Sequence, residues 1–309
     1  MSEDKKFPSN KKCCSGQIYS SIAVVGLGLI GASLGAAVSK NNLAAEVRGY
    51  DIDRETVEMA EDGYYFDSAH LLPDSCYTGI GSAELVIISV PVIDIPVVME
   101  DISEKIGPKT TIIDTGSCKG FVMEKAAEIF TDQARFIGGH PLAGSEKSGI
   151  KNLDPELFIG SDFVLTPREQ EIRSDKLEKL LKLIGGLDAR VKIMDCEKHD
   201  RYLALVSHLP QIASSGLAGF IGDEENLIEL LELASSGFSD TTRLAASNSN
   251  MWTDITLANK DRILEAMEDY LKQIETLVDA IQSENREEVK RFFEKGIDVR
   301  KRFEELKGE

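Results

Sequence analysis

A glycine pattern near the N-terminus constrains the fold more than any other feature of the sequence. An apolar, β-prone run over residues 22–25 leads into Gly26, Gly28 and Gly31, spaced Gly-x-Gly-x-x-Gly, and a helical pattern over residues 33–39 follows. Gly26 permits a tight turn, Gly28 lets the backbone approach a pyrophosphate, and Gly31 lets the helix pack close to the strand. The N-terminus of that helix would face the phosphates. The sequence therefore predicts a strand–turn–helix unit that binds a dinucleotide.

An acidic residue further along the chain narrows the choice of dinucleotide. A second predicted strand, over residues 46–50, ends at Asp51, twenty residues after Gly31. A carboxylate there would accept hydrogen bonds from the adenosine ribose and would repel a ribose phosphate. This favours NAD over NADP, although Arg54 nearby leaves NADP open. The alternative interpretation, a strand–turn–helix unit without a nucleotide, is disfavoured because strand, glycines and acid coincide.

Two further apolar runs predict more strands of the same sheet. Residues 85–90 form a continuous apolar run that stops at Pro91, and residues 110–114 form another that stops before a loop containing Ser117. Continuous apolar strands separated by helical segments indicate a parallel sheet that is buried on both faces. Ser117 has an alternative interpretation as the N-cap of a helix over residues 121–130.

A histidine follows what reads as the next buried strand. Phe136 and Ile137 are interpreted as the end of that strand, and residues 138–149 as a glycine-rich loop that contains His140. In an open parallel sheet, ligands bind beyond the carboxyl ends of the strands. We therefore expect Pro91, Ser117 and His140 along one rim, with His140 placed for chemistry. The alternative for a lone histidine is a structural role in which it caps a turn.

Length and pattern predict two domains. A chain of 309 residues exceeds the usual limit of a single core. Residues 162–166 and 190–194 read as further strands with a helix over 174–184 between them, and every later segment, including 227–235 and 259–306, has helical periodicity. We expect a disordered tail over 1–17, a nucleotide-binding domain over 18–196 and a helical domain over 197–309. No strand-rich segment follows, so we do not expect an added regulatory domain or a mutase domain.

Charge and cysteine content exclude several classes of function. The chain has 35 basic and 53 acidic residues, a net charge of −18, which disfavours binding to nucleic acid or anionic membranes. No apolar run reaches the ~18 residues of a membrane helix, and the N-terminus lacks the apolar stretch of a signal peptide, so we expect a cytoplasmic protein. The five cysteines have no metal-binding spacing. Cys76, Cys118 and Cys196 are expected near buried elements as reduced thiols.

The helical half contains several residues with two interpretations. Pro210 should kink the first helix, because it lacks an amide donor and clashes with the preceding turn. His199 and Asp200 read as the start of that helix, with the acid at its positive end. For His208 a buried structural role competes with a role in a site. Trp252 reads as core or interface, as aromatics in helical domains usually are.

Five linked motifs, spread in order from about residue 21 to 260, together resemble the prephenate/arogenate dehydrogenases of tyrosine biosynthesis. The motifs are Gly26-x-Gly28-x-x-Gly31; Asp114-x-Gly116-Ser117-x-Lys119; His140-Pro141-Leu142-Ala143-Gly144-Ser145-Glu146; His199-Asp200 with Ser207-His208-Leu209-Pro210; and Gly237-Phe238-x-Asp240-x-Thr242-Arg243 followed by Met251-Trp252. The resemblance implies an α/β fold, a Rossmann-type mainly parallel sheet domain followed by an all-helical dimerisation domain. It also implies a homodimer that uses NAD to oxidise and decarboxylate prephenate, giving 4-hydroxyphenylpyruvate.

The resemblance implies roles for individual residues. His140 would accept the proton of the substrate hydroxyl, and Ser117 would orient both the imidazole and that hydroxyl. Arg243, expected to be buried because an acidic protein needs a local cation for a dicarboxylate, would bind a substrate carboxylate. Glu146 would gate the site through its charge. Asp240 would hold Arg243 or pair with a histidine across the cleft.

The remaining roles concern substrate choice, the cofactor and the partner subunit. Many prephenate-using relatives have histidine three residues after the position of His208, where this chain has Gln211, so arogenate stays an alternative substrate. Trp252 is expected near the partner's site in an interlocked dimer. A pocket for a hydroxylated ring and a carboxylate should also admit tyrosine as a competitive inhibitor. The residues assigned to NAD are Gly26, Gly28, Leu29, Ile30, Gly31, Asp51, Ser89, Val90, Pro91 and Ser117, and no metal is expected.

Two other classes of protein share part of this pattern. A 3-hydroxy acid dehydrogenase with a helical second domain would share the glycines, but such enzymes usually rely on a lysine in the helical domain. A non-catalytic, NAD-responsive binding protein would also keep the glycines. It would not need His140, Ser117 and Arg243 together.

Overall fold

The computed structural model describes residues 16–63, 65–73, 76–130, 135–144 and 147–308. Most of the tail predicted over residues 1–17 therefore lies outside the described residues. The first half of the chain forms an eight-stranded sheet in the order β3-β2-β1-β4-β5-β6-β7-β8. All neighbouring strands are parallel except β6 and β7, as expected for a mainly parallel Rossmann-type sheet. The strands are β1 (Ile22–Val25), β2 (Val47–Asp51), β3 (Ser68–Leu71), β4 (Leu85–Ile88), β5 (Thr111–Asp114), β6 (Arg135–Leu142), β7 (Asp162–Thr166) and β8 (Arg190–Ile193).

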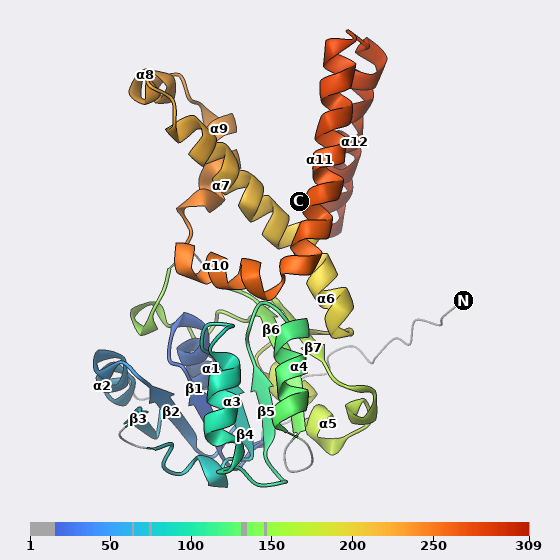
Figure 1. The fold of residues 1–309 in the computed structure, drawn as a ribbon. Coiled ribbons are helices and arrows are strands. Elements are labelled where there is room, and N and C mark those ends of the chain that lie inside the picture. The colour runs from blue at the N-terminus through green and yellow to red at the C-terminus, as the bar shows by residue number, and fades with distance from the viewer. Residues whose placement is uncertain (1–15, 64, 74–75, 131–134, 145–146, 309) are drawn as a thin grey trace.

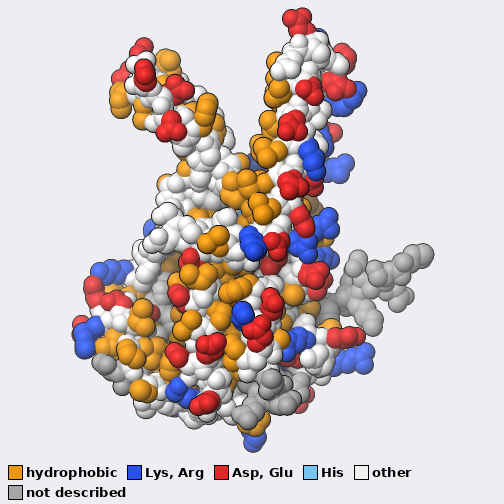
Figure 2. Space-filling model, in the orientation of Figure 1, with side chains coloured by type: hydrophobic (Ala, Val, Ile, Leu, Met, Phe, Trp, Pro, Cys, Tyr) orange, Lys and Arg blue, Asp and Glu red, His pale blue; other side chains and the backbone are white. Residues whose placement is uncertain are grey.

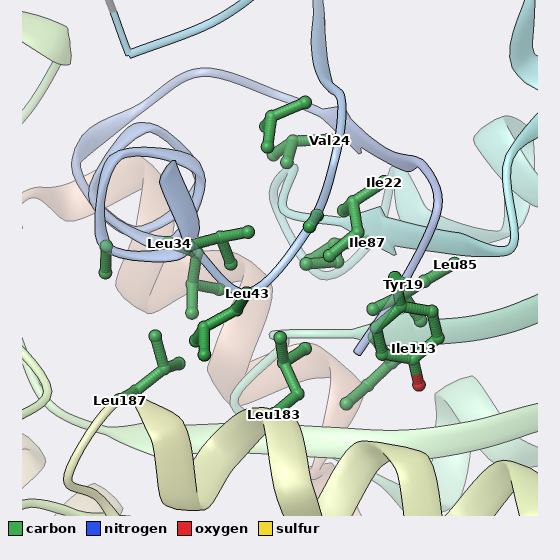
Figure 3. Packing of buried hydrophobic residues seen from close by; sticks show 14 of the residues in the cluster. Tyr19, Ile22, Val24, Leu34, Leu43, Leu85, Ile87, Ile113, Leu183 and Leu187 are labelled. Carbon is green, nitrogen blue, oxygen red and sulfur yellow. The ribbon is translucent and has the colours of Figure 1, made fainter. Parts of the chain in front are cut away.

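Helices cover both faces of this sheet (Figure 1). The helices of this half are α1 (Leu29–Lys40), α2 (Arg54–Asp62), α3 (Ile95–Ser103), α4 (Gly120–Ile129) and α5 (Asp175–Gly186), with short 3-10 turns η1 (Ile80–Ser82), η2 (Ile150–Asn152) and η3 (Glu169–Glu171). One apolar core lies between the sheet and α1, α2 and α5, and a second lies between the sheet and α3 and α4. Figure 3 shows the first core, a single cluster that includes Leu34 of α1, Leu183 of α5 and Ile113 of the sheet.

The strand that carries His140 is longer than predicted. Its predicted end is Ile137, whereas β6 continues through His140 to Leu142 by pairing with β7 in antiparallel register. Gly138 and Gly139 do not end the strand. They are required because neighbouring atoms leave no room for a Cβ. A Cβ on Gly138 would lie 2.2 Å from Oγ1 of Thr166, and one on Gly139 would lie 2.6 Å from the Asp114 carbonyl oxygen. His140 therefore sits on a rigid strand and not in a loop.

The second half of the chain is helical. The first helical run is continuous: α6 (Cys196–Leu203) passes into a π-helical turn, η4 (Ala204–His208), and then into α7 (Leu209–Gly222). The π turn directly precedes Pro210, as expected where proline removes a backbone donor. The remaining helices are α8 (Leu227–Glu232), α9 (Ser236–Thr242), η5 (Arg243–Ala246), α10 (Ser249–Ala258), α11 (Lys260–Gln282) and α12 (Arg286–Lys307). No helix in the described part of the chain combines the length and apolarity needed to cross a membrane.

The helical half has two arms that diverge away from the sheet (Figure 1). One arm consists of α7, α8 and α9, and the other of α11 packed along α12. The buried apolar cluster where they meet is small, with Ala204, Ile263 and Ala266 at its centre. Figure 2 shows hydrophobic side chains along both arms, including the side of the α11–α12 arm that faces the other arm. Large apolar residues exposed there include Phe220, Ile228, Leu264, Leu271, Val278 and Phe293.

Candidate active site

The glycine turn after β1 is shaped by close backbone contacts. Gly26 has φ +91°, and a Cβ there would lie 2.4 Å from the Ser89 carbonyl oxygen. A Cβ on Gly31 would lie 2.0 Å from the Gly26 carbonyl oxygen, so only glycine allows α1 to pack this close. A Cβ on Gly28, by contrast, would meet nothing within 4 Å. The turn thus leaves open space at Gly28, where a phosphate would approach the N-terminus of α1.

The start of α1 and the end of β2 complete the site around the glycine turn. We call residues 26–31 together with Asp51 the glycine cradle. Gly28 occupies the N-cap position of α1 without a side-chain cap, so the amides of the first turn remain free for an anion. Asp51 is the last residue of β2, and its Oδ2 accepts a 2.6 Å hydrogen bond from the Leu27 amide. Its Oδ1 accepts from the Asp53 amide at 2.9 Å. Each carboxylate oxygen retains acceptor capacity for a hydroxyl, so these residues fit a dinucleotide with an unphosphorylated ribose.

A buried ion pair joins the carboxyl end of β5 to Gly139 in β6. The Lys119 ammonium pairs with Asp114, and neither side chain is exposed. Lys119 also donates to the Gly139 carbonyl at 2.6 Å, while Asp114 accepts from the amides of Gly116, at 2.8 Å, and Gly139, at 3.0 Å. These bonds join the end of β5, the loop after it and the residue before His140 into one unit. The sequence motif contained both charged residues but did not show that they pair.

His140 takes part in a chain of hydrogen bonds that reaches into the helical half. Its Nδ1 lies 2.9 Å from Nε2 of His199, and Nδ1 of His199 lies 2.7 Å from Oδ1 of Asp200. His199 is fully buried. The two rings meet edge to face, with centroids 5.1 Å apart. One acid and two imidazoles are thereby connected in series, although their sequence separation gave no reason to join them.

Asp200 also caps the helix that follows the β5 loop. Its Oδ1 accepts from the Lys119 amide and its Oδ2 from the Gly120 amide, each at 2.7 Å. Because α4 begins at Gly120 with Lys119 at the N-cap position, the interpretation of Ser117 as that N-cap is wrong. A distant carboxylate replaces the local side-chain cap. Burial raises the pKa of Asp200, but the hydrogen bonds from His199 and the two amides outweigh it and leave the pKa below its ordinary value.

His199 and Asp200 do not start their helix, contrary to the sequence interpretation. The α6 helix begins at Cys196, and Asp195 caps it by accepting from the Lys198 amide at 2.7 Å. His199 and Asp200 therefore lie one turn inside the helix and face the sheet. This is why they reach β6 and α4.

His140 is held in its neutral form. Burial is the largest cause that puts the pKa of His140 well below its usual range, and the nearby His199, Lys119 and His208 lower it further. Nε2 of His140 makes no hydrogen bond with any described residue. A neutral imidazole with one uncommitted nitrogen can accept a proton. Ser117 is half-buried on the neighbouring loop and makes no hydrogen bond to His140 in the described part of the chain.

His208 has structural partners. The Asn259 amide nitrogen donates to Nδ1 of His208 at 3.2 Å and to the Asp200 carbonyl at 2.9 Å. The ring packs edge to face against Trp252 of the same chain, with centroids 6.0 Å apart. Burial lowers the pKa of His208 to about 4, with Asp200 opposing the shift and His199 adding to it. Asn259, which the sequence analysis did not single out, thus connects α11 to the chain of histidines.

Gln211 is buried, and of its two polar side-chain atoms only the amide nitrogen has hydrogen-bond partners among the described residues. Its amide nitrogen donates to the Leu244 carbonyl at 2.8 Å and to Oγ of Ser215 at 3.3 Å. Its Oε1 is buried and has no partner among the described residues. The Leu244 carbonyl fixes which way the amide points, because an oxygen could not donate to it. The side chain therefore presents an unpaired acceptor.

Arg243 differs from the expectation of a buried cation. It stands at the start of η5, is exposed, and makes no ion pair with any described residue. Asp240 is also exposed and does not pair with Arg243. The physical reason is that α9 and η5 pack on α7 and on each other, which leaves their outer side uncovered in a single chain. Glu146 lies outside the described residues.

Comparisons with known proteins agree on one family. The family models described as prephenate dehydrogenase, nucleotide-binding domain, and prephenate dehydrogenase, dimerization domain, match residues 34–193 and 195–295. The chain is 34% identical over 287 residues to the prephenate dehydrogenase of Bacillus subtilis, covering 92% of this chain and 76% of that protein. It is 34% identical over 291 residues to the prephenate dehydrogenase of Lactococcus lactis, covering 93% and 78%.

Solved structures give the same result. The prephenate dehydrogenase from A. aeolicus in complex with hydroxyphenyl propionate and NAD+ superposes with a TM-score of 0.84 at 28% identity, covering 94% of this chain and 99% of that one. The Synechocystis arogenate dehydrogenase superposes with a TM-score of 0.79 at 28% identity, covering 92% and 99%. Relatives with either substrate in their names thus share the whole fold.

Proposed function

Because the chain belongs to the prephenate dehydrogenase family, we propose that it oxidises prephenate with NAD and releases carbon dioxide to give 4-hydroxyphenylpyruvate. The chain is an NAD-dependent oxidoreductase of that family. The single observation that carries the choice of reaction is the buried His140 on β6, which shares a hydrogen bond with His199 through Nδ1 and has no partner for Nε2 among the described residues.

The cradle supports NAD as the cofactor. Gly28 and the free amides of the first turn of α1 would hold the pyrophosphate, and Asp51 would accept from the ribose hydroxyls. Leu29 and Ile30 begin α1, and Ser89 and Val90 lie against Gly26. With Pro91, these residues would line the dinucleotide site. Bound NAD supplies the acceptor for the hydride that leaves the ring carbon.

His140 would carry the proton chemistry. Its free Nε2 accepts the proton of the ring hydroxyl as the carbon–oxygen double bond forms, and Ser117 orients that hydroxyl. The bond between the ring and its carboxylate then breaks, carbon dioxide leaves, and the ring becomes aromatic. The phenolate oxygen takes the proton back from His140. His140 is therefore neutral again at the end of the reaction, and no external base is needed.

Arg243 would bind a substrate carboxylate, and the dimer would complete its surroundings. Its exposure and free guanidinium in one chain leave the bidentate donor face available for a carboxylate. The match to the family's dimerization domain, over residues 195–295, includes most of both arms. We propose that a second copy of the chain packs against their exposed apolar surface. Within that dimer Trp252 would lie near the partner's site, Glu146 would act as the charged gate, and Asp240 would pair with Arg243 or with a histidine.

Arogenate is the second candidate substrate, and Gln211 is the observation that favours it. The unpaired Oε1 of Gln211 is a buried acceptor that needs a donor. Arogenate carries an ammonium group where prephenate has a keto oxygen, and only the ammonium can donate. If Gln211 lies against the substrate side chain, the Gln211→Leu variant should lose more kcat/KM with arogenate than with prephenate.

Steady-state formation of NADH with each substrate tests the proposed function. We expect the chain to oxidise prephenate with NAD, with a lower kcat/KM when NADP replaces NAD because Asp51 repels the ribose phosphate. A higher kcat/KM for arogenate than for prephenate would establish the second candidate. Failure to oxidise either compound would contradict the proposal.

We also propose that tyrosine competes with the substrate at this site. A pocket that holds a hydroxylated ring and a carboxylate fits a phenolic amino acid, and the inhibitor would use the same Arg243 anchor. Tyrosine should raise the apparent KM without lowering kcat. A noncompetitive pattern that survives in the Arg243→Ala variant would instead reveal a second site.

We propose the cytoplasm as the compartment in which the enzyme acts. Cys76, Cys118 and Cys196 are free thiols in the described part of the chain, as is usual for proteins of a reducing compartment. Of these, Cys76 is itself exposed but lies beside the buried Tyr77, Cys118 is buried, and Cys196 is intermediate.

A further inference from the structure

We propose that His199 and Asp200 form a positioning relay that keeps the ring proton of His140 on Nδ1 and leaves its Nε2 free to accept a proton. The inference rests on the proposed function for the role of His140, and it adds two residues that do not touch the substrate. It is carried by the order of donors and acceptors along the chain from Asp200 to His140.

The relay starts from a carboxylate that can only accept. Asp200 receives three hydrogen bonds, from the amides of Lys119 and Gly120 and from His199, each 2.7 Å long. The two amides are backbone donors whose direction is set by the start of α4, so they fix the carboxylate in place. An ionised carboxylate has no proton to donate. The proton in the bond to His199 must therefore belong to Nδ1 of His199.

The tautomer of His199 then determines the tautomer of His140. A neutral imidazole that carries its proton on Nδ1 has a lone pair on Nε2. In the proposed relay His199 is neutral, so its Nε2 accepts in the 2.9 Å bond to His140 and Nδ1 of His140 donates. The only nitrogen of His140 that has a lone pair is Nε2, which is the nitrogen without a partner among the described residues.

The same chain would stabilise the charge that His140 gains. When Nε2 accepts the substrate proton, the imidazolium keeps its bond from Nδ1 to His199. The negative charge of Asp200 lies at the far end of that bond series, in surroundings where burial strengthens electrostatic interactions. Without the relay, His140 would be free to place its proton on Nε2, where it would block proton acceptance.

Nitrogen NMR of histidine-labelled protein tests the relay directly. The chain has only four histidines, so their ring nitrogens can be assigned with single variants. We expect His140 of the wild-type protein at neutral pH to carry its proton on Nδ1, with Nε2 unprotonated. A wild-type spectrum with a protonated Nε2 would overturn the relay, even in a protein that oxidises prephenate.

Two matched variants separate positioning from packing. Glutamine at position 199 places its amide near the Nε2 position and can accept from His140, whereas asparagine places its amide near Nδ1 and can bond only to Asp200. We expect His199→Gln to keep the His140 tautomer and to retain kcat within about tenfold. His199→Asn should lose the tautomer preference and lower kcat by on the order of 10²–10⁴-fold, with the KM for NAD unchanged.

The outcomes distinguish this inference from the proposed function. Equal kcat values in the two variants, with either spectrum, would overturn the relay. The predicted spectrum in a protein that oxidises neither prephenate nor arogenate would overturn the proposed function and leave the relay in place, because the spectrum is recorded without substrate.

Discussion

Lys119 shows at the scale of one residue how the site is held. Its ammonium is completely buried, and its partners are the Asp114 carboxylate and the Gly139 carbonyl. Asp114 ends β5, and Gly139 directly precedes His140 within β6. A buried ion pair adds little net stability, but removal of one member leaves an uncompensated charge. The main contribution of Lys119 to stability is therefore that it neutralises the buried charge of Asp114.

Replacement of Lys119 should therefore be costly. We expect Lys119→Met to lower the free energy of unfolding by about 3–5 kcal/mol, because Asp114 is left buried without its counterion. Urea denaturation measures the change. Lys125→Met is the matched control, since Lys125 pairs with Glu128 at 2.8 Å on the surface, where an ion pair contributes little to stability. Equal effects of the two substitutions would show that the Lys119 pair is not the constraint described.

The glycine turn and α1 give a prediction at the scale of one element. Gly28→Ala meets no atom within 4 Å and its φ of −64° suits alanine, so we expect folding stability within about 0.5 kcal/mol of the wild type but weaker NAD binding. Gly31→Ala places its Cβ 2.0 Å from the Gly26 carbonyl oxygen, so α1 must shift and stability should fall. Thermal unfolding and NAD titration separate the two effects. Unchanged NAD affinity in Gly28→Ala would move the pyrophosphate away from this turn.

The elements of the sheet half followed closely from local sequence. The strands β4 and β7 lie where they were predicted, and α5 (Asp175–Gly186) matches the helix predicted over 174–184, with Ser174 as its N-cap. Sequence failed at β6, where Gly138 and Gly139 look like a loop. They are required instead by Thr166 and Asp114, which lie close only after folding. A local pattern cannot reveal a contact between strands that meet through tertiary packing.

The same limitation applies to the candidate site. His140 could be found because it follows a strand in a distinctive segment, and the glycines because their spacing has a mechanical meaning. The capping of α4 by Asp200 could not be found, because it joins residues 80 positions apart. The bond between His140 and His199 spans 59 positions. The sequence around His199 and Asp200 does not distinguish them from a histidine or an acid in an ordinary helix.

At the scale of the whole molecule, the helical half is under-packed as a single chain. Its buried apolar cluster is small, while large apolar side chains on both arms face outward (Figure 2). Exposed apolar surface of this extent on helices marks a protein interface. Together with the match to the dimerization domain, this supports a second copy of the chain as the partner.

A charge on that surface should separate the proposed dimer. Leu271 on α11 is 52% exposed, and Leu271→Glu would bury an unpaired carboxylate at an apolar interface. We expect this variant to sediment as a monomer at concentrations where the wild type is dimeric. Gln273→Glu, two residues along the same helix at an exposed position bonded to Lys295, is the control and should remain dimeric. A wild type that sediments as a monomer would contradict the proposed assembly.

In the proposed reaction His140 accepts the proton of the substrate hydroxyl, and the His140→Asn variant removes that acceptor. In His140→Asn the amide nitrogen can still donate to His199, but the acceptor at Nε2 is lost. With prephenate and NAD, we expect kcat to fall by ~10²-fold or more, while the dissociation constants of NAD and substrate stay within a few-fold of the wild-type values. A kcat that remains within a few-fold of the wild type would contradict the claim.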